Sequence, residues 1–347
     1  MKQNLQRILH RARDRGDLDR EEIVELLSVS EGTEIHALIA AAGSVRRACV
    51  GDEVRLRGIV EFSNACERSC LYCGLRCGNR KVERYRMSED EIAASAREMA
   101  RFRIPTIVLQ SGEDSSCDAE RICRMVRRIR KETGLIVTLS IGERTREEYR
   151  EFRRAGADRY LLKHETADVA LYGRLRPASR FENRLQCLAW LKELGYEVGS
   201  GNMVGLPGQS LESLADDILL MKDLDIDMIG IGPFISHPDT PLGGFPNGSI
   251  DLVLKTIAVA RMATRNTNIP ATTALGTLDP DGRTRALAAG ANVIMPDFTP
   301  APYRSHYEIY PGRNRTGADQ GIFLENLSRR LASAGRTLGY DASGWRE

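Results

Sequence analysis

The sequence lacks the marks of a membrane or secreted protein. No segment is an uninterrupted apolar run long enough to span a bilayer, and residues 1–20 are dense in Arg, Asp and Glu, without the apolar core of a signal peptide. Eight cysteines in 347 residues are too few for a disulfide scaffold of this length. We therefore expect a cytosolic protein whose thiols stay reduced.

A strong net charge and histidine metal motifs are also absent. The 50 Lys and Arg nearly balance the 48 Asp and Glu, and a net charge of +2 gives no general electrostatic attraction to nucleic acid or a membrane surface. The five histidines show no H-E-x-x-H or H-x-H spacing, so a histidine-bound catalytic metal is not expected. We expect a small-molecule substrate.

The most informative feature present is a C-x3-C-x2-C run formed by Cys66, Cys70 and Cys73, directly after the alternating apolar stretch 56–62. Three thiolates on one short loop suit one iron–sulfur cluster, and they leave one iron of a four-iron cubane without a protein ligand. Such an iron can bind and reduce a small molecule. The alternatives are a disulfide, which needs an oxidising compartment, and a zinc loop that uses Cys77 as its fourth ligand.

Short apolar runs alternate with amphipathic helical patterns along most of the chain. Eight such units predict an α/β fold, a complete (β/α)8 TIM-type barrel spanning 51–312, with an N-terminal helical extension at 1–50 and a C-terminal helical tail at 313–347 packed on the barrel. The predicted strands are 56–62, 106–110, 135–141, 159–163, 197–204, 228–231, 271–274 and 293–295. A doubly wound sheet is the alternative, but its glycine cluster at 199–205 is one residue too long for the dinucleotide fingerprint.

Local signals support the helices between these strands. Ser88 with Glu91, and Thr145 with Glu148, match the capping box that begins a helix. In a (β/α)8 barrel the chemistry gathers at the carboxyl ends of the strands, and the cysteine loop follows the first strand. We therefore expect a site on that rim.

Polar residues follow other predicted strands. The segment 110–114 combines a glycine, which allows close backbone approach, with two carboxylates, although it also reads as an ordinary polar turn. Lys163, Glu165 and Arg184 carry charges that an apolar barrel interior would leave unpaired, so they are expected to face a ligand at the mouth. The tyrosines of 303–310 either line the cavity or form an amphipathic cap over it.

Seven segments together resemble a known family. They are 66–76, 108–114, 157–165, 181–184, 203–209, 230–235 and 268–273. The cysteine triplet is similar to the signature of radical S-adenosylmethionine (SAM) enzymes, and the whole set resembles the HydE family, the radical SAM maturases of [FeFe]-hydrogenase within the biotin synthase-like group. The resemblance runs from about residue 50 to residue 312.

The resemblance implies one [4Fe–4S] cluster, SAM, an electron donor, and work beside HydG and HydF on a small organometallic substrate, an iron–cysteine complex bearing CO and cyanide. It implies that Cys66, Cys70 and Cys73 ligate the cluster. The residues that it places around SAM are Tyr72, Ser111, Gly112, Glu113, Asp114, Thr138, Ser140, Glu165, Arg184 and Met203. Those that it places around the substrate are Gln110, Arg159, Lys163, Met228, Thr272, Thr273, Tyr307 and Tyr310.

Two departures from the family qualify this reading. No cysteine follows Cys187, so we expect a single cluster. Lys163 stands where the resemblance leads us to expect arginine, and an ammonium does not offer a carboxylate the planar two-pronged donor of a guanidinium. The alternatives are another biotin synthase-like enzyme, such as a methylornithine synthase relative that rearranges a carbon skeleton, and a non-enzymatic iron–sulfur carrier.

Overall fold

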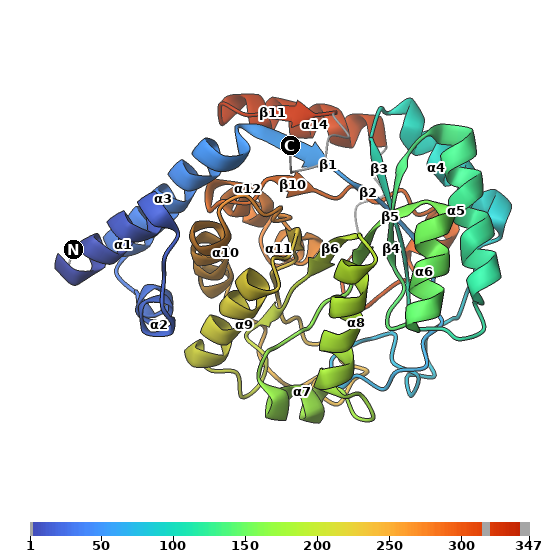
Figure 1. Ribbon diagram of the computed structural model, residues 1–347, viewed down its shortest axis with the longest axis horizontal. Coiled ribbons are helices and arrows are strands. Elements are labelled where there is room, and N and C mark those ends of the chain that lie inside the picture. The colour runs from blue at the N-terminus through green and yellow to red at the C-terminus, as the bar shows by residue number, and fades with distance from the viewer. Residues whose placement is uncertain (1–2, 314–319, 341–347) are drawn as a thin grey trace.

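The core of the molecule is a six-stranded parallel sheet. The structure, a computed structural model, describes residues 3–313 and 320–340 (Figure 1). In the sheet, each strand lies parallel to the one before it in the order β2-β3-β4-β5-β6-β8. The strands are β2 (Gly58–Ser63), β3 (Thr106–Ser111), β4 (Ile136–Ser140), β5 (Ala157–Leu161), β6 (Glu197–Ser200) and β8 (Met228–Ile229). Such strands are buried on both faces, which explains why Ile107, Val108 and Leu109 are all apolar and fully buried.

Helices follow the strands and surround the sheet (Figure 1). The predicted alternation of strand and helix is confirmed, and Ser88 and Thr145 form the predicted capping boxes at the starts of α4 and α6. The helices after the strands are α4 (Glu89–Arg101), α5 (Ala119–Thr133), α6 (Arg146–Ala155), α7 (Val169–Leu175), α8 (Phe181–Glu193), α9 (Leu211–Asp223), α10 (Ile250–Thr264), α11 (Thr273–Leu278), α12 (Gly282–Ala288) and α13 (Ala301–Arg304).

Further parallel pairing continues beyond the sheet. Strand β1 (Glu53–Leu56) lies between β10 (Val293–Ile294) and β11 (Thr337–Gly339), and β7 (Met203–Val204) pairs with β9 (Gly232–Pro233). Isolated parallel bridges join Met228 to Asn268, Pro270 to Val293, and Ile59 to Asp297. Parallel backbone pairs thus lead from β8 through residues 268–270 and 293–297 back to β2.

Three predicted strands differ from the structure in more than their bounds. The stretch 197–204 is divided between β6 and β7, which belong to different sheets. The strand at 271–274 is wrong, because Thr272 is the N-cap residue of α11 and Thr273 begins that helix. The extended segment ends near Pro270, and threonine is a favoured residue before a helix. The stretch 56–62 is divided between β1 and β2, which are separated at Arg57 and belong to different sheets.

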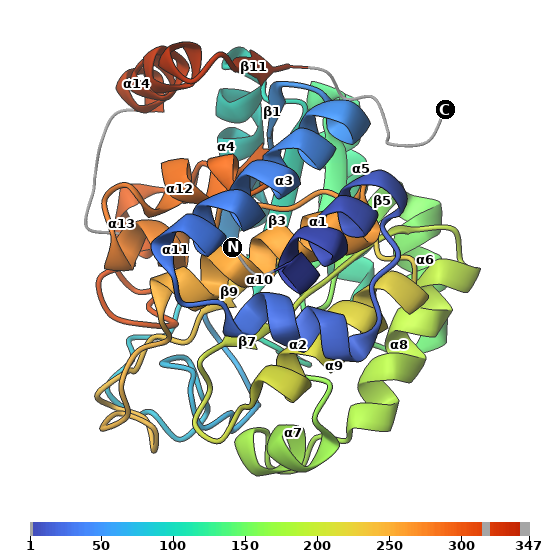
Figure 2. The ribbon, with the colours of Figure 1, turned by 90° about the vertical axis from the view of Figure 1, so that its left-hand side faces the viewer.

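Both ends of the chain pack on the outside of the sheet and its helices. Helices α1 (Gln3–Arg15), α2 (Arg20–Ser28) and α3 (Gly32–Val50) lie across the molecule, with α3 against α10 and α2 against α9 (Figure 2). Arg20 on α2 pairs with Asp216 on α9 through two hydrogen bonds of 2.6 and 2.9 Å. At the other end, α14 (Gln320–Ser333) leads into β11, while residues 314–319 and 341–347 of the expected tail lie outside the described residues.

None of the helices in residues 3–313 and 320–340 combines the length and the apolar content of a membrane span.

Candidate active site

A cavity of about 360 Å³ lies at the carboxyl ends of the parallel strands. Gln110 and Ser111 end β3, Ser140 ends β4, Lys163 follows β5, and Gly230 follows the two-residue strand β8. Because the strands are parallel and in register, their carboxyl ends bring these residues to one place. The volume is in the range of small-molecule sites.

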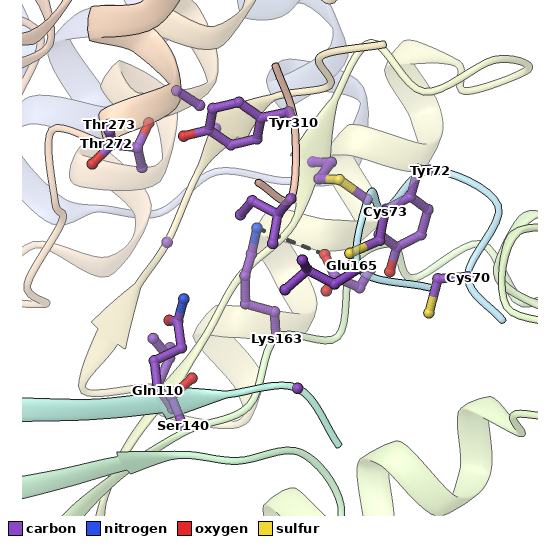
Figure 3. A pocket seen from close by; sticks show the side chains of 18 of the residues that line it. Cys70, Tyr72, Cys73, Gln110, Ser140, Lys163, Glu165, Thr272, Thr273 and Tyr310 are labelled. Atoms are coloured by element: carbon purple, nitrogen blue, oxygen red, sulfur yellow. Dashed lines mark ion pairs between the residues drawn. The ribbon is translucent and has the colours of Figure 1, made fainter. Parts of the chain in front are cut away.

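Most of the predicted site residues line this cavity, with Cys70, Tyr72 and Cys73 in one part of it and Thr272, Thr273 and Tyr310 in another (Figure 3). The predicted residues among its lining are Cys66, Cys70, Tyr72, Cys73, Gln110, Ser111, Gly112, Glu113, Ser140, Lys163, Glu165, Arg184, Met203, Met228, Thr272, Thr273, Tyr307 and Tyr310.

Three predicted residues lie away from the cavity. Arg159 is buried, and its guanidinium donates to the Glu197 carboxylate at 2.6 and 3.2 Å and to the Thr106 hydroxyl at 2.9 Å. Thr138 lies beside Arg159 in a separate small cavity. Asp114 accepts hydrogen bonds from Arg86 and lines a larger polar cavity outside the site. The structure therefore does not place Arg159 beside a substrate, or Asp114 and Thr138 beside SAM.

The cysteine loop is fastened to its surroundings by backbone hydrogen bonds. The Leu71 N–H donates to the carbonyl of Leu175 at 2.9 Å, and the Gly74 N–H donates to the carbonyl of Ile309 at 2.9 Å. A Cβ atom on Gly74 would lie 2.2 Å from the Glu308 carbonyl oxygen, so only glycine fits this crossing. The loop is thus held between α7 and the segment that precedes the C-terminal tail.

Gly112 has a different role from the one predicted. A Cβ at this position would lie 2.2 Å from the Ala65 carbonyl oxygen and 2.6 Å from the Cys66 Cβ. The glycine therefore allows the end of β3 to approach the cysteine loop, rather than serving only to admit a ligand.

The three thiols fit a cluster better than a single ion. All eight cysteines, each within the described residues, are free, and Cys66, Cys70 and Cys73 line one cavity. Within residues 3–313 and 320–340, no three His, Cys, Asp or Glu side chains converge on a position for one metal ion. A zinc ion needs such convergence, whereas each cysteine of an iron–sulfur cluster binds its own iron. Cys77, the proposed fourth zinc ligand, is exposed.

Burial raises the pKa of the thiols of Cys66, Cys70 and Cys73. A buried thiol tends to keep its proton, and a bound metal cation supplies the positive charge that stabilises the thiolate. Soft sulfur donors in an apolar, partly enclosed loop are therefore suited to iron–sulfur ligation.

A network of charged side chains borders the cavity next to the cysteine loop. Glu113 accepts from Arg68 at 2.7 Å and pairs with Arg176 at 3.1 Å and Arg184 at 3.5 Å, while Glu143 pairs with Arg184 at 3.0 Å. Burial by itself raises the pKa of Glu113, but the three arginines outweigh it, and the pKa lies below its usual value. Three guanidinium groups against two carboxylates leave this wall with an excess of positive charge.

Arg176 is a cavity residue that the sequence reasoning missed. Its guanidinium donates to the Tyr72 hydroxyl at 3.0 Å and lies over the ring of Tyr172 at 5.6 Å. It belongs to no recognisable motif, and it reaches the site because α7 ends against the cysteine loop. No signal in the local sequence distinguishes it from the many surface arginines.

Glu165 is held in an unusual backbone conformation. Its φ angle is 71°, in the left-handed region that residues other than glycine rarely adopt. The Glu165 N–H donates to the Gly201 carbonyl at 2.9 Å, and the Glu165 carbonyl accepts from the Met203 N–H at 3.0 Å. Its carboxylate faces the cavity 3.6 Å from the Lys163 ammonium (Figure 3). Surrounding structure thus fixes a strained residue at the site.

A buried polar network lies directly behind Glu165. One ring nitrogen of His164 lies 3.0 Å from the Ser200 hydroxyl, and the other lies 3.2 Å from the Asp217 carboxylate. Asp217 also accepts from the Asn202 amide at 2.8 Å, and the side chains of His164 and Asp217 are fully buried. Since substrates cannot reach this Ser–His–Asp arrangement, it holds the backbone and is not a nucleophilic triad.

The tyrosines predicted at 303–310 do not share one helical face, because α13 ends at Arg304. The Tyr303 hydroxyl donates to Glu91 at 2.6 Å, while Tyr307 and Tyr310 line the cavity. Arg313, also missed by the sequence reasoning, joins them there. Of the two alternatives, Tyr303 fits the cap, and the other two fit the cavity wall.

Free thiols on a loop after the first strand of a parallel α/β sheet, beside a charged cavity, define the class of radical SAM proteins. Residues 60–221 match the radical SAM superfamily. The [FeFe] hydrogenase maturase subunit HydE of Thermotoga maritima is 49% identical over 331 residues, which cover 95% of each chain. The chain belongs to the HydE family.

Related proteins of other function are more distant. The 3-methylornithine synthase of Methanosarcina acetivorans is 30% identical and covers 92% of this chain and 93% of its own. The crystal structure of methylornithine synthase (PylB) superposes with a TM-score of 0.85 at 27% identity, covering 96% of this chain and 97% of the other. HydG superposes with a TM-score of 0.83 at 19% identity, over 98% of this chain and 76% of its own, which shows the common fold.

Proposed function

We propose that this protein is a radical SAM enzyme that matures the H-cluster of [FeFe]-hydrogenase. It reductively cleaves SAM at a [4Fe–4S] cluster to give a 5′-deoxyadenosyl radical, and it processes a small iron complex that carries CO, cyanide and cysteine. The observation that carries the proposal is the meeting of three free thiols with a charged cavity in a chain 49% identical to a hydrogenase maturase.

The cysteine loop is assigned to the cluster. Cys66, Cys70 and Cys73 would each hold one iron. When bound, the cluster supplies one electron and an iron that is open to SAM. The loop and its hydrogen bonds to α7 and to residue 309 keep the three thiols on one side of the cavity.

The charged wall is assigned to SAM, which carries a carboxylate, an ammonium and a sulfonium. Arg184 and Arg176 are suited to the carboxylate, since a guanidinium matches its two oxygens. Glu165 is suited to the cationic side of the molecule. The other residues proposed to contact SAM are Tyr72, Ser111, Gly112, Glu113, Ser140 and Met203.

A second group of lining residues is assigned to the iron substrate. Gln110, Lys163, Met228, Thr272, Thr273, Tyr307 and Tyr310 line it. A primary alkyl radical abstracts hydrogen from almost any neighbouring C–H, so these residues must hold the target in place and exclude water.

We propose that the strands close into a complete (β/α)8 barrel at 51–312, with 1–50 as an outer helical extension and 313–347 as a tail. The Ile59 N–H donates to the Pro296 carbonyl at 2.8 Å, and the Phe298 N–H donates to the Ile59 carbonyl at 2.8 Å, which supports closure beside β2. The Ile229 N–H donates to Asn268 at 2.7 Å and supports it beside β8. The pairing of β11 with β1 adds a strand to the tail that was expected to be helical.

The proposed partners are HydG as the source of the substrate, HydF as the acceptor of the product, and a low-potential electron donor. A cytosolic location stays a prediction.

The test is in vitro maturation under anaerobic conditions. Protein with a reconstituted cluster, incubated with SAM and a reductant, is expected to form 5′-deoxyadenosine. Together with HydG and HydF it is expected to activate apo-hydrogenase. Cys70→Ala protein is the matched control. If the cluster is intact but no 5′-deoxyadenosine forms, the enzymatic proposal fails and an iron–sulfur carrier takes its place.

A second function, a carbon-skeleton rearrangement, is favoured by the similarity to 3-methylornithine synthase at 30% identity and a TM-score of 0.85 for the PylB structure. SAM cleavage coupled to formation of 3-methylornithine from an isomeric diamino acid, without hydrogenase activation, would establish it instead.

A further inference from the structure

Arg313 reaches into the cavity from the end of the first described segment. Its side chain is 9% exposed, and its guanidinium lies over the rings of Tyr307 at 5.4 Å and Tyr310 at 5.8 Å. All three residues line the cavity. A guanidinium that is stacked on two rings is restrained in orientation.

A buried carboxylate anchors Arg313. Its guanidinium pairs with Glu61, which is fully buried on β2 and paired in register with the cavity residue Gln110. The backbone of Glu61 is itself fixed, because its N–H donates to the Thr299 hydroxyl at 2.9 Å and its carbonyl accepts from the Tyr85 hydroxyl at 2.6 Å. Glu61 therefore holds the guanidinium in a defined place.

Donors on this side of the cavity are left without acceptors. Within the described residues, neither the buried Nε of Arg313 nor the buried hydroxyl of Thr272 has a hydrogen-bond partner. Buried polar atoms without partners are rare, and two that line one cavity are accounted for by a ligand that binds there. Thr273 and the Tyr310 hydroxyl belong to the same side, and Figure 3 shows Thr272, Thr273 and Tyr310 away from Cys70. A ligand group that accepts hydrogen bonds would satisfy both the Arg313 Nε and the Thr272 hydroxyl.

Lys163 cannot bind a carboxylate through two parallel hydrogen bonds, as a guanidinium can. It is a point charge already 3.6 Å from Glu165, and it lacks a planar fork. Arg313 has that fork, and with one side paired to Glu61 it retains Nε for a ligand. Burial lowers the pKa of Arg313 to about 10, which still leaves the guanidinium protonated at neutral pH.

We infer that Arg313, oriented by Glu61, binds a carboxylate of the substrate in the part of the cavity that Tyr307 and Tyr310 line. The inference rests on the proposed function, in which the carboxylate is that of the cysteine bound to iron. Arg313 would thus provide the planar, two-pronged hydrogen bonding to a carboxylate that Lys163 cannot provide.

The test compares two iron complexes, one made with cysteine and one with cysteine amide, which has no carboxylate. Wild-type protein is expected to turn over the first with a KM about 10- to 100-fold lower, the range for a hydrogen bond to a charged group. Arg313→Gln is expected to remove this discrimination. Arg313→Lys is expected to lose most of it, since an ammonium has no fork.

Two further variants separate binding from folding. Arg313→Gln leaves Glu61 buried without its partner, so the double variant Arg313→Gln, Glu61→Gln replaces the ion pair by a neutral pair. It is expected to fold and still lack discrimination. Arg329→Gln, at an exposed arginine of α14, is the control and is expected to match wild type. SAM affinity, measured by the change in the electron paramagnetic resonance spectrum of the cluster, is expected to be unchanged in all of them.

Equal KM values for the two complexes in wild-type protein would overturn the role of Arg313 and leave the proposed function intact. Discrimination that survives in the double variant would also overturn it. Wild-type protein that cleaves SAM but uses neither complex would overturn the proposed function and the inference together.

Discussion

Replacement of His164 by alanine is expected to destabilise the protein and to weaken SAM binding. The fully buried imidazole contacts Ser200 at 3.0 Å and Asp217 at 3.2 Å. Loss of the contact to the Asp217 carboxylate costs about 1.5–3 kcal/mol, and the cavity left in a tightly packed region adds about 2 kcal/mol. The free energy of unfolding is therefore expected to fall by about 3–5 kcal/mol.

The effect on SAM follows from the next residue. Glu165 adopts a left-handed backbone that costs on the order of 1–3 kcal/mol, and the network behind it helps to hold that conformation. Without the imidazole, Glu165 relaxes and its carboxylate leaves the cavity for part of the time. We expect the Kd for SAM to rise about tenfold.

The assay pairs denaturant unfolding with SAM titration of the reconstituted cluster, followed by electron paramagnetic resonance. His164→Asn, which keeps a hydrogen-bonding group in the pocket, is expected to recover part of both losses. His10→Ala, at a histidine of α1 with 69% side-chain exposure, is the control and is expected to change neither by much. Lower stability with an unchanged Kd for SAM would refute the link from the network to Glu165. Unchanged stability would refute the energetic argument itself.

Three other predictions concern the cysteine loop and the charged wall. Cys70→Ala is expected to abolish cluster loading and SAM cleavage, whereas Cys77→Ala leaves both nearly unchanged, as measured by iron content and 5′-deoxyadenosine. Gly74→Ala is expected to lower cluster content severalfold, because its Cβ would lie 2.2 Å from the Glu308 carbonyl oxygen. The arginines around Glu113 lower its pKa below 4.5, so their stabilisation is complete above that pH and is lost as the pH falls through the lowered pKa. Acid unfolding is therefore expected to show a smaller loss of stability below pH 4.5 in Glu113→Gln than in wild type.

The parts that the sequence predicted well depend on local rules. Capping boxes at Ser88 and Thr145 are read from residues three positions apart, and both are confirmed. Parallel strands put their carboxyl ends at one edge, so the residues after those strands could be expected to meet. Gln110 and Lys163, at the ends of β3 and β5, both line the cavity as this rule predicts.

The predicted residues that lie away from the cavity show what alternation along a strand does not specify. Arg159 and Lys163 are four positions apart and share a side of the extended segment, but that spacing is roughly 13 Å of strand. Lys163 therefore reaches the cavity, while Arg159 lies deeper and pairs with Glu197. Alternation along the sequence predicts which face of the sheet a side chain lies on, whereas its position along the strand direction relative to the cavity depends on the register of the neighbouring strands.

Arg176 and Arg313 were missed for a different reason. Each comes to the cavity from a segment outside the main strands, and each is positioned by a partner far away in sequence, Glu113 in one case and Glu61 in the other. Contacts of this kind depend on the folding of the whole chain. A local pattern cannot distinguish them among the 50 basic residues.

The charges in the cavity share a common arrangement that bears on how it binds ligands. Lys163 pairs with Glu165, Arg313 pairs with Glu61, and Arg184 pairs with Glu143. Arg184 and Arg313 are almost fully buried, whereas the Lys163 side chain is 29% exposed. A ligand carboxylate can therefore add to or replace the partner of either arginine with little further loss of hydration. Such exchange favours zwitterionic and anionic ligands over neutral ones. Only a negatively charged group can replace the electrostatic interaction that the cation loses when its carboxylate partner is displaced.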